Sequence, residues 1–243
     1  MMSWLKIGLK SMTKKVLVTG VSSGIGRAQA EHLLAKGYQV YGLDISLKPE
    51  LKGDFHFMRL DLSEDLSPLF DWLPQVDILL NTAGILDAYK PLLEMRQTDF
   101  EKLFATNFFS VVKLTRFYLE KMLAQQSGII INMCSIASFQ AGGGGAAYTS
   151  SKHALAGFTR QLALDYAKAG IQVFGIAPGA VQTGMTASDF IEGGLADWVA
   201  EQTPIGRWTQ AEEIADLTDF LVSGKAASMQ GEIVKIDGGW TLK

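Results

Sequence analysis

The chain has 243 residues, of which 48% are hydrophobic and 19% are charged, a composition typical of one ordered globular domain and not of a long disordered chain. Since 22 Lys and Arg face 25 Asp and Glu, the net charge gives no basic footprint for nucleic acid or for an anionic membrane surface. The sequence lacks the run of about eighteen apolar residues that a membrane span needs, and Cys134, the single cysteine, has no partner for an internal disulfide, so we expect a cytoplasmic protein.

Short β-branched segments alternate with longer segments of helical period along most of the chain. Residues 1–12 are expected to form a loose tail or to lie upstream of the true start, and residues 13–243 to form one domain. Strands are expected at residues 16–19, 38–43, 55–60, 76–80, 129–133, 171–176 and 233–236, and helices at 25–36, 98–124, 147–168 and 211–221. This alternation predicts a doubly wound α/β fold of the Rossmann type, with a seven-stranded parallel sheet and helices on both faces in three layers. The least regular stretch, residues 186–210, is expected to be a helical flap over a substrate.

A glycine-rich turn joins the first predicted strand to the first helix. Such a turn, with Gly20, Gly24 and Gly26, brings the backbone close to a pyrophosphate at the helix N-terminus, although a purely structural turn also uses glycine. Asp44 ends the second strand 18 positions after Gly26, the spacing at which a carboxylate meets an adenosine ribose. The two features together predict a dinucleotide site.

The cofactor preference depends on the residues around the ribose. A carboxylate at Asp44 accepts hydrogen bonds from both ribose hydroxyls and repels a 2′-phosphate. The turn carries Ser22 and Ser23, with no Arg or Lys to offset that repulsion. We therefore expect NAD(H) to be preferred over NADP(H).

Tyr148 and Lys152 are four positions apart in a predicted helix, so they share one helical face. An exposed pair without function would have the same spacing. A cation about 5 Å from the phenol, at an effective dielectric of about 20, would favour the phenolate by roughly 3 kcal/mol, which is about two pKa units. The spacing therefore predicts that Lys152 lowers the pKa of Tyr148, and that together with the positive charge of an oxidised nicotinamide it lets Tyr148 exchange a proton with a substrate near neutral pH.

Further polar residues fit the same site. Ser135 follows the strand at 129–133 and would reach the same substrate oxygen, although a serine at a strand end also serves as a cap. Asn107 lies among phenylalanines, where it would either satisfy a helix carbonyl or hold a water that links Lys152 to solvent. The four glycines at 142–145 leave two alternatives, a roomy or mobile pocket and a harmless loop. The histidines His32, His56 and His153 are scattered, so no metal site is predicted.

Six motifs in this order resemble the compact branch of the short-chain dehydrogenase/reductase family, from about residue 14 to the C-terminus. They are Thr19-Gly-x-x-x-Gly24-x-Gly26, Asn81-Thr82-Ala83-Gly84, Asn107, Ser135, Tyr148-x-x-x-Lys152 and Pro178-Gly179-Ala180-Val181-Gln182-Thr183. The resemblance implies reversible hydride transfer between a nicotinamide and a ketone or secondary alcohol.

The resemblance also assigns roles to residues. Ser135 would polarise the substrate oxygen, Tyr148 would be the acid and base, Lys152 would bind the nicotinamide ribose, and Asn107 would maintain the proton relay. Asp61 and Leu62 match adenine contacts, Asn81, Ala83 and Gly84 would lie beside the adenine ribose, and Pro178, Gly179, Val181 and Thr183 would border the nicotinamide. The full set of implied cofactor-binding residues is Gly20, Ser22, Ser23, Gly24, Ile25, Gly26, Asp44, Ile45, Asp61, Leu62, Asn81, Ala83, Gly84, Tyr148, Lys152, Pro178, Gly179, Val181 and Thr183.

The substrate is less defined by the motifs. Segments 206–208, 212–215 and 231–239 resemble bacterial 3-oxoacyl-[acyl-carrier-protein] reductases, but those enzymes commonly carry a basic residue at the position of Ser23 and use NADPH. Dehydrogenases of cyclic dihydrodiols such as 2,3-dihydro-2,3-dihydroxybenzoate use NAD and end their second strand in Asp, as this chain does. Non-catalytic dinucleotide sensors of the family usually lose the tyrosine or the lysine. The resemblance further implies a homotetramer that pairs the helices at 98–124 and 147–168, acting on a small-molecule or carrier-bound carbonyl substrate.

Overall fold

The computed structural model describes residues 13–242, so the tail predicted at residues 1–12 lies outside the described residues. The strands are β1 (Lys15–Thr19), β2 (Gln39–Asp44), β3 (Phe55–Arg59), β4 (Ile78–Asn81), β5 (Gly128–Met133), β6 (Ile171–Pro178) and β7 (Ile233–Ile236). They pair in parallel in the order β3-β2-β1-β4-β5-β6-β7. The predicted seven-stranded parallel sheet is confirmed.

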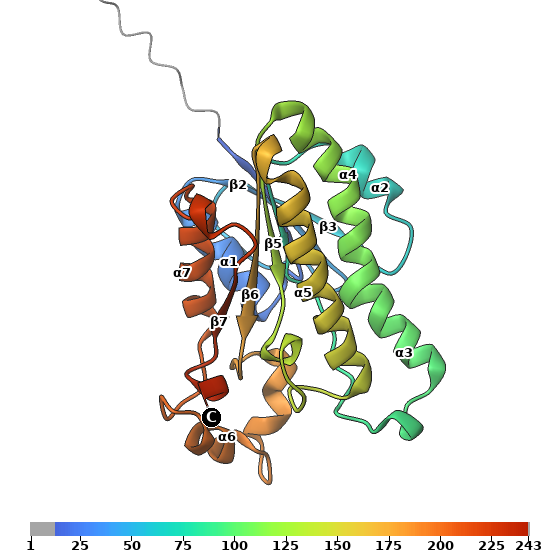
Figure 1. The fold of residues 1–243 in the computed structure, drawn as a ribbon, viewed down its shortest axis with the longest axis vertical. Coiled ribbons are helices and arrows are strands. Elements are labelled where there is room, and N and C mark those ends of the chain that lie inside the picture. Colours follow the sequence, from blue (N-terminus) through green and yellow to red (C-terminus); the bar gives the residue numbers. More distant parts are fainter. Residues whose placement is uncertain (1–12, 243) are drawn as a thin grey trace, which may run out of the picture.

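Alternate side chains of the central strands enter two hydrophobic cores, one on each face of the sheet. In β1, Val16 and Val18 pack with helices α1 (Gly24–Ala35) and α7 (Ala211–Val222). Leu17, between them, packs on the other face with α2 (Ser67–Trp72), α4 (Ser110–Gln125) and α5 (Ala146–Tyr166). Figure 1 shows α7 and α1 on one side of the sheet and α4 and α5 on the other, which confirms the three predicted layers.

The long helix predicted at residues 98–124 is interrupted. Helix α3 (Gln97–Phe104) runs into a π-helical turn (Ala105–Phe109) before α4 begins. A π turn changes the angular register of the residues that follow, and such turns are frequent at functional sites. Its buried residue is Asn107, a polar side chain that a continuous α-helix would place differently. Helix α2 was not predicted, because six residues are too few to give a recognisable period.

The carboxyl ends of the strands form the edge where the remaining loops gather. The strand order reverses between β1 and β4, so the loops after these strands diverge and leave a crevice between them. Helix α6 (Ala196–Gln202) lies beyond this edge, below the sheet in Figure 1. Together with the 3-10 helix Gly184–Phe190 it forms the helical part of the segment in which the flap was predicted. None of the helices described in residues 13–242 combines the length and the apolarity that crossing a membrane requires.

Candidate functional site

A cavity of about 790 Å³ opens at the carboxyl edge of the sheet. Its wall includes the reactive residues Ser135, Tyr148 and Lys152, together with most of the implied cofactor-binding residues. The latter are Gly20, Ser23, Gly24, Ile25, Gly26, Asp44, Ile45, Asp61, Leu62, Ala83, Gly84, Pro178, Gly179, Val181 and Thr183. Ser22, Asn81 and Asn107 were also predicted for the site but do not line the cavity.

The glycine-rich turn after β1 packs backbone to backbone against the loop after β4. A Cβ at Gly26 would collide with the carbonyl oxygen of Gly20, and one at Gly20 would lie 3.0 Å from Ala83 Cα. Thr19 Oγ1 accepts the backbone N–H groups of Thr82 at 2.9 Å and Ala83 at 3.0 Å. Side chains are thus excluded where α1 begins, leaving a bare cradle that fits a pyrophosphate.

Asp44 presents an oriented carboxylate at the end of β2. Its Oδ2 accepts the N–H of Ser22 at 2.9 Å, and its Oδ1 accepts the N–H of Ser46 at 2.8 Å. Ser22 serves Asp44 through its backbone, and its hydroxyl donates to Leu47 O at 2.8 Å. Asp44 still lines the cavity, so its oxygens fit as acceptors for the hydroxyls of a dinucleotide ribose.

Asp61 lines the cavity together with Asp44, and its carboxylate form is stabilised by hydrogen bonds. Hydrogen bonds from the backbone and then the side chain of Ser63 lower the pKa of the Asp61 carboxyl. These two bonds measure 2.9 and 2.7 Å.

Asn81 lies inside the sheet and not beside the cavity. Its Nδ2 donates to Asn132 Oδ1 at 2.8 Å, and Asn132 Nδ2 donates to Thr159 Oγ1 at 2.9 Å. The chain of bonds ties β4 and β5 to α5. The Asn81 side chain is thus used within the protein, and the expectation that Asn81 lies beside the adenine ribose stays a prediction for its backbone.

Asn107 pairs with the loop that follows β4. Its Oδ1 accepts the N–H of Ile85 at 2.8 Å and its Nδ2 donates to the carbonyl of Ile85 at 2.9 Å. This two-way bond differs from a bond to a helix carbonyl, one of the two alternatives drawn from the sequence. It fixes the loop next to Gly84, where an added Cβ would lie 3.4 Å from Asn107 Oδ1 and 3.7 Å from Lys152 Nζ.

Tyr148 and Lys152 share one face of α5, as predicted. Lys152 Nζ lies 5.5 Å from the centroid of the Tyr148 ring and donates to Met133 O at 2.7 Å. The lysine is 4% exposed, and burial lowers its pKa to about 8. The ammonium is thus anchored to the end of β5.

The pKa of Tyr148 differs in direction from the sequence prediction. Burial raises it to about 12, while a hydrogen bond with Ser135 lowers it by less. The low-dielectric surroundings disfavour the phenolate, and they weaken the charge on Lys152 as well. The predicted lowering of the Tyr148 pKa by its lysine neighbour is wrong for the protein alone.

Asp87 is a site residue that the sequence reasoning missed. Its carboxylate is 6% exposed and accepts three backbone N–H groups: Gly145 at 2.7 Å, Tyr148 at 2.9 Å and Tyr89 at 3.3 Å. Gly145 is the N-cap of α5 and lacks a side chain to cap it. Asp87 supplies the cap from the β4 loop, at the helix end where a negative charge is favoured. It also holds Ala88 and Tyr89, which have left-handed φ angles of 52° and 57°.

The glycine run at 142–145 is built into this arrangement. A Cβ at Gly145 would lie 2.6 Å from Asp87 Oδ2, and one at Gly144 would lie 2.5 Å from Tyr148 Cδ1. Real Cβ atoms do not approach so closely, so the cap and the tyrosine ring both require glycine there. The run of glycines is evident in the sequence. The reason for glycine at position 145 is not, because it depends on the Asp87 carboxylate 58 positions away.

Cys134 lines the cavity, yet burial raises the pKa of its thiol. This agrees with a buried strand-end residue and not with a thiolate nucleophile. Within residues 13–242, no group of three or more His, Cys, Asp or Glu side chains is arranged to hold a metal ion.

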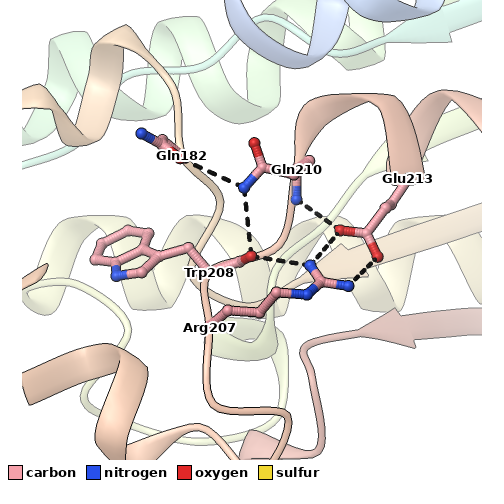
Figure 2. Close-up of polar contacts among 5 residues, drawn as sticks. All are labelled: Gln182, Arg207, Trp208, Gln210 and Glu213. Atoms are coloured by element: carbon pink, nitrogen blue, oxygen red, sulfur yellow. Dashed lines mark hydrogen bonds and ion pairs between the residues drawn. The ribbon is translucent and has the colours of Figure 1, made fainter. Parts of the chain in front are cut away.

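An ion pair anchors the end of the segment around α6 to the start of α7 (Figure 2). Arg207 Nη1 and Nη2 donate to the two oxygens of Glu213 at 2.8 and 3.0 Å. The backbone N–H of Gln210 also donates to Glu213 at 2.8 Å, which completes a capping box. Arg207, and then Gln210, lower the pKa of Glu213 to about 2. Arg207 further donates to Trp208 O at 3.1 Å, which fixes this end of the segment.

The chain is similar to proteins of known activity over nearly its whole length. The sequence model of the family described as short chain dehydrogenase matches residues 14–192. A 3-oxoacyl-[acyl-carrier-protein] reductase of Escherichia coli (strain K12) is 34% identical, over 93% of this chain and 96% of the relative.

Solved structures show the same fold with either dinucleotide. A 4-hydroxyisoleucine dehydrogenase complexed with NADH has a TM-score of 0.90 and 30% identity, covering 95% of this chain and 100% of that one. A gluconate 5-dehydrogenase from Burkholderia cenocepacia J2315 in complex with NADP and tartrate has a TM-score of 0.86 and 27% identity, covering 95% and 96%. The matched family and the cavity at the carboxyl edge of the sheet agree, and the chain belongs to the short-chain dehydrogenase/reductase family of NAD(P)-dependent oxidoreductases.

Proposed function

We propose that this protein interconverts a ketone and a secondary alcohol with NAD(H), using Tyr148 as the acid and base. The observation that carries the proposal is the convergence of Tyr148, Ser135 and Lys152 in the same cavity as the Asp44 carboxylate. A non-catalytic dinucleotide sensor would have no need for this convergence. Proton transfer by a positioned side chain requires such proximity.

The three polar side chains have separate roles. A bound nicotinamide dinucleotide would supply or accept the hydride at the substrate carbon. Ser135 and Tyr148 hold the substrate oxygen between their hydroxyls, and Tyr148 gives that oxygen a proton in reduction and takes it back in oxidation. Lys152, held by Met133 O, lies where the nicotinamide ribose is implied and keeps a positive charge near the phenol. Asn107 positions the adjoining loop through Ile85.

The cofactor would lie along the predicted residues, with its pyrophosphate at the glycine-rich turn and its adenosine ribose at Asp44. The carboxylate is oriented by Ser22 and Ser46, and it would repel a 2′-phosphate. We therefore propose a preference for NAD(H). The preference is tested by kcat/KM with NADH and NADPH in the wild type and in Asp44→Ala. We expect the ratio to favour NADH in the wild type and to fall at least tenfold in the variant, since like charges in contact cost more than the ~1.4 kcal/mol of one decade. An unchanged ratio would contradict the assignment.

The proposed substrate is a carbonyl compound like that of a 3-oxoacyl-[acyl-carrier-protein] reductase. Identity of 34% with the Escherichia coli enzyme supports this class. The specific feature in favour of a second candidate, an NAD-dependent dehydrogenase of a cyclic diol, is Asp44 itself. In both cases the segment 186–210 would cover the substrate, because its residues Leu195 and Trp198, and Met185 just before it, line the cavity.

A substrate panel separates these candidates. Oxidation of NADH and NADPH is followed with a 3-oxoacyl thioester and simple cyclic ketones, and reduction of NAD is followed with cyclic diols. We expect turnover of at least one class with NADH. Binding of NADH without turnover of any compound would favour the sensor instead.

The homotetramer implied by the family also stays a proposal. Phe109 and Leu164 are exposed apolar side chains at the start of α4 and on α5, the helices expected to pair. Light scattering of the full chain measures the assembly, and a monomer mass would contradict it.

A further inference from the structure

Resting on the proposed function, we infer that the reacting part of the substrate is uncharged and mainly apolar, and that Asp189 excludes anionic substrates from the cavity. The inference concerns the end of the cavity beyond Tyr148, away from the dinucleotide residues. Two independent features of that end carry it: its apolar rim and its uncompensated negative charge.

The rim of the cavity is apolar and unusually exposed. Tyr89, Met185, Leu195 and Trp198 line the cavity, yet they are 59%, 51%, 55% and 53% exposed. Tyr89 comes from the loop after β4, and the other three come from the segment that holds α6. Contiguous exposed apolar side chains at a cleft mark a binding surface for an apolar partner. Burying these four side chains requires a ligand with an apolar body next to its carbonyl group.

The charged residues in the cavity wall divide into two groups. Asp44, Asp61 and Lys102 belong to the dinucleotide end, since Lys102 lowers the pKa of Asp61 by its charge after the hydrogen bonds of Ser63. Lys152 belongs to the reacting centre, where its ammonium is bound to Met133 O. Lys102 and Lys152 are the cations among the described residues of the wall. The far end therefore offers no cation to a substrate carboxylate.

Asp189 is the charged residue that remains at the far end. Asp189 lines the same cavity as Tyr89 and Tyr148, and its charge, after burial, raises the pKa of Tyr89. Asp189 and Tyr89 are therefore neighbours in the cavity wall. Within residues 13–242 no hydrogen bond or ion pair to the Asp189 side chain is found. A carboxylate in the substrate would meet this charge without compensation, whereas a distal hydroxyl would donate to it.

A matched pair of substrates tests how a negative charge on the substrate changes kcat/KM. The methyl ester of 4-oxocyclohexanecarboxylic acid and the free carboxylate share the ring and the ketone, and differ mainly in charge. We expect the wild type to reduce the ester with a kcat/KM at least tenfold above that of the carboxylate. Asp189→Asn should reduce that ratio at least fivefold, mainly by a lower KM for the carboxylate, with a smaller change in kcat/KM for the ester. Ser188→Asn, a change at an exposed neighbour outside the cavity wall, should leave the ratio as in the wild type.

A binding measurement gives a second readout without turnover. Tryptophan fluorescence, to which Trp198 contributes, is titrated with the two corresponding alcohols, and the ratio of their Kd values should follow the same pattern. Equal kcat/KM for ester and carboxylate, or an unchanged ratio in Asp189→Asn, would overturn the inference while the proposed function stands. Failure to reduce either ketone, with the alcohols still bound in the expected ratio, would contradict the proposed function and leave the inference supported. Failure of both readouts would overturn both.

Discussion

The glycine-rich turn after β1 and the segment from Gly184 to Gln210 border the same cavity, but they are built differently. The turn is locked by the protein itself, because Thr19 Oγ1 bonds the β4 loop and glycine contacts exclude side chains. The segment around α6 instead leaves apolar side chains such as Met185 and Trp198 half exposed. Contacts within the protein fix the conformation of the glycine-rich turn. The segment around α6 instead leaves apolar surface exposed that a bound ligand would bury.

This difference predicts how substitutions behave. Changes in the locked region and on α5 affect every substrate equally, because they act on the cofactor or the reacting oxygen. Changes in the segment around α6 affect substrates unequally. The following experiments sharpen or break that distinction.

The largest effect is expected for Tyr148→Phe. The variant keeps the ring but loses the hydroxyl that exchanges the proton, so kcat should fall by about 10²–10⁴-fold for all substrates. The Kd for NADH, measured by fluorescence titration, should change little. Near-normal kcat would remove Tyr148 from the proton transfer.

Asp87→Ala is expected to have the next largest effect. Three backbone N–H groups would lose their acceptor, and leaving buried donors unpaired costs about 1–3 kcal/mol. Urea unfolding should show this loss of stability, and kcat should fall by a similar factor for each substrate because the N-terminus of α5 carries Tyr148. Asp87→Asn, which keeps one acceptor oxygen, should lose less on both counts. An alanine variant with wild-type stability and kcat would show that the cap is dispensable.

Arg207→Leu is expected to have the smallest effect on stability. The pair with Glu213 is partly exposed, with side chains 52% and 37% exposed, so its loss should cost little stability. The effect should appear instead as unequal changes in KM among substrates. Because the Glu213 pKa is lowered to about 2, the pair stabilises the fold above the ordinary glutamate pKa and fades as the pH falls toward 2. The stability difference between wild type and variant should therefore shrink in acid. A uniform fall in kcat across substrates would contradict this expectation, because it would show that Arg207 acts on the cofactor or the reacting oxygen, as residues of the glycine-rich turn and α5 do.

Much of the fold could be predicted from the sequence because buried parallel strands are continuous apolar runs. The strand from Ile233 to Ile236 was predicted with its observed bounds. The π turn around Asn107 could not be predicted, since its residues keep a helical pattern while the backbone changes. The role of this turn becomes clear only from a tertiary contact, the pair of hydrogen bonds between the Asn107 side chain and the backbone of Ile85.

The site was predicted where chemistry follows from local spacing and missed where it follows from tertiary contacts. Tyr148 and Lys152 are one helical turn apart, so their proximity is local. The raised pKa of Tyr148 depends on burial, which spacing does not reveal. Asp87 lies far in sequence from the helix it caps, and the Asn81 side chain bonds Asn132, its register partner on β5.

Hydride transfer in this cavity is tested most directly by single-turnover oxidation of bound NADH. Protein loaded with NADH is mixed rapidly with an excess of a neutral cyclic ketone. Fluorescence of the dinucleotide reports binding before mixing, and its absorbance reports oxidation afterwards. We predict that bound NADH is oxidised in one phase, with one alcohol formed for each NADH. Tight binding of NADH that persists unoxidised with every ketone tested would contradict the proposed reaction.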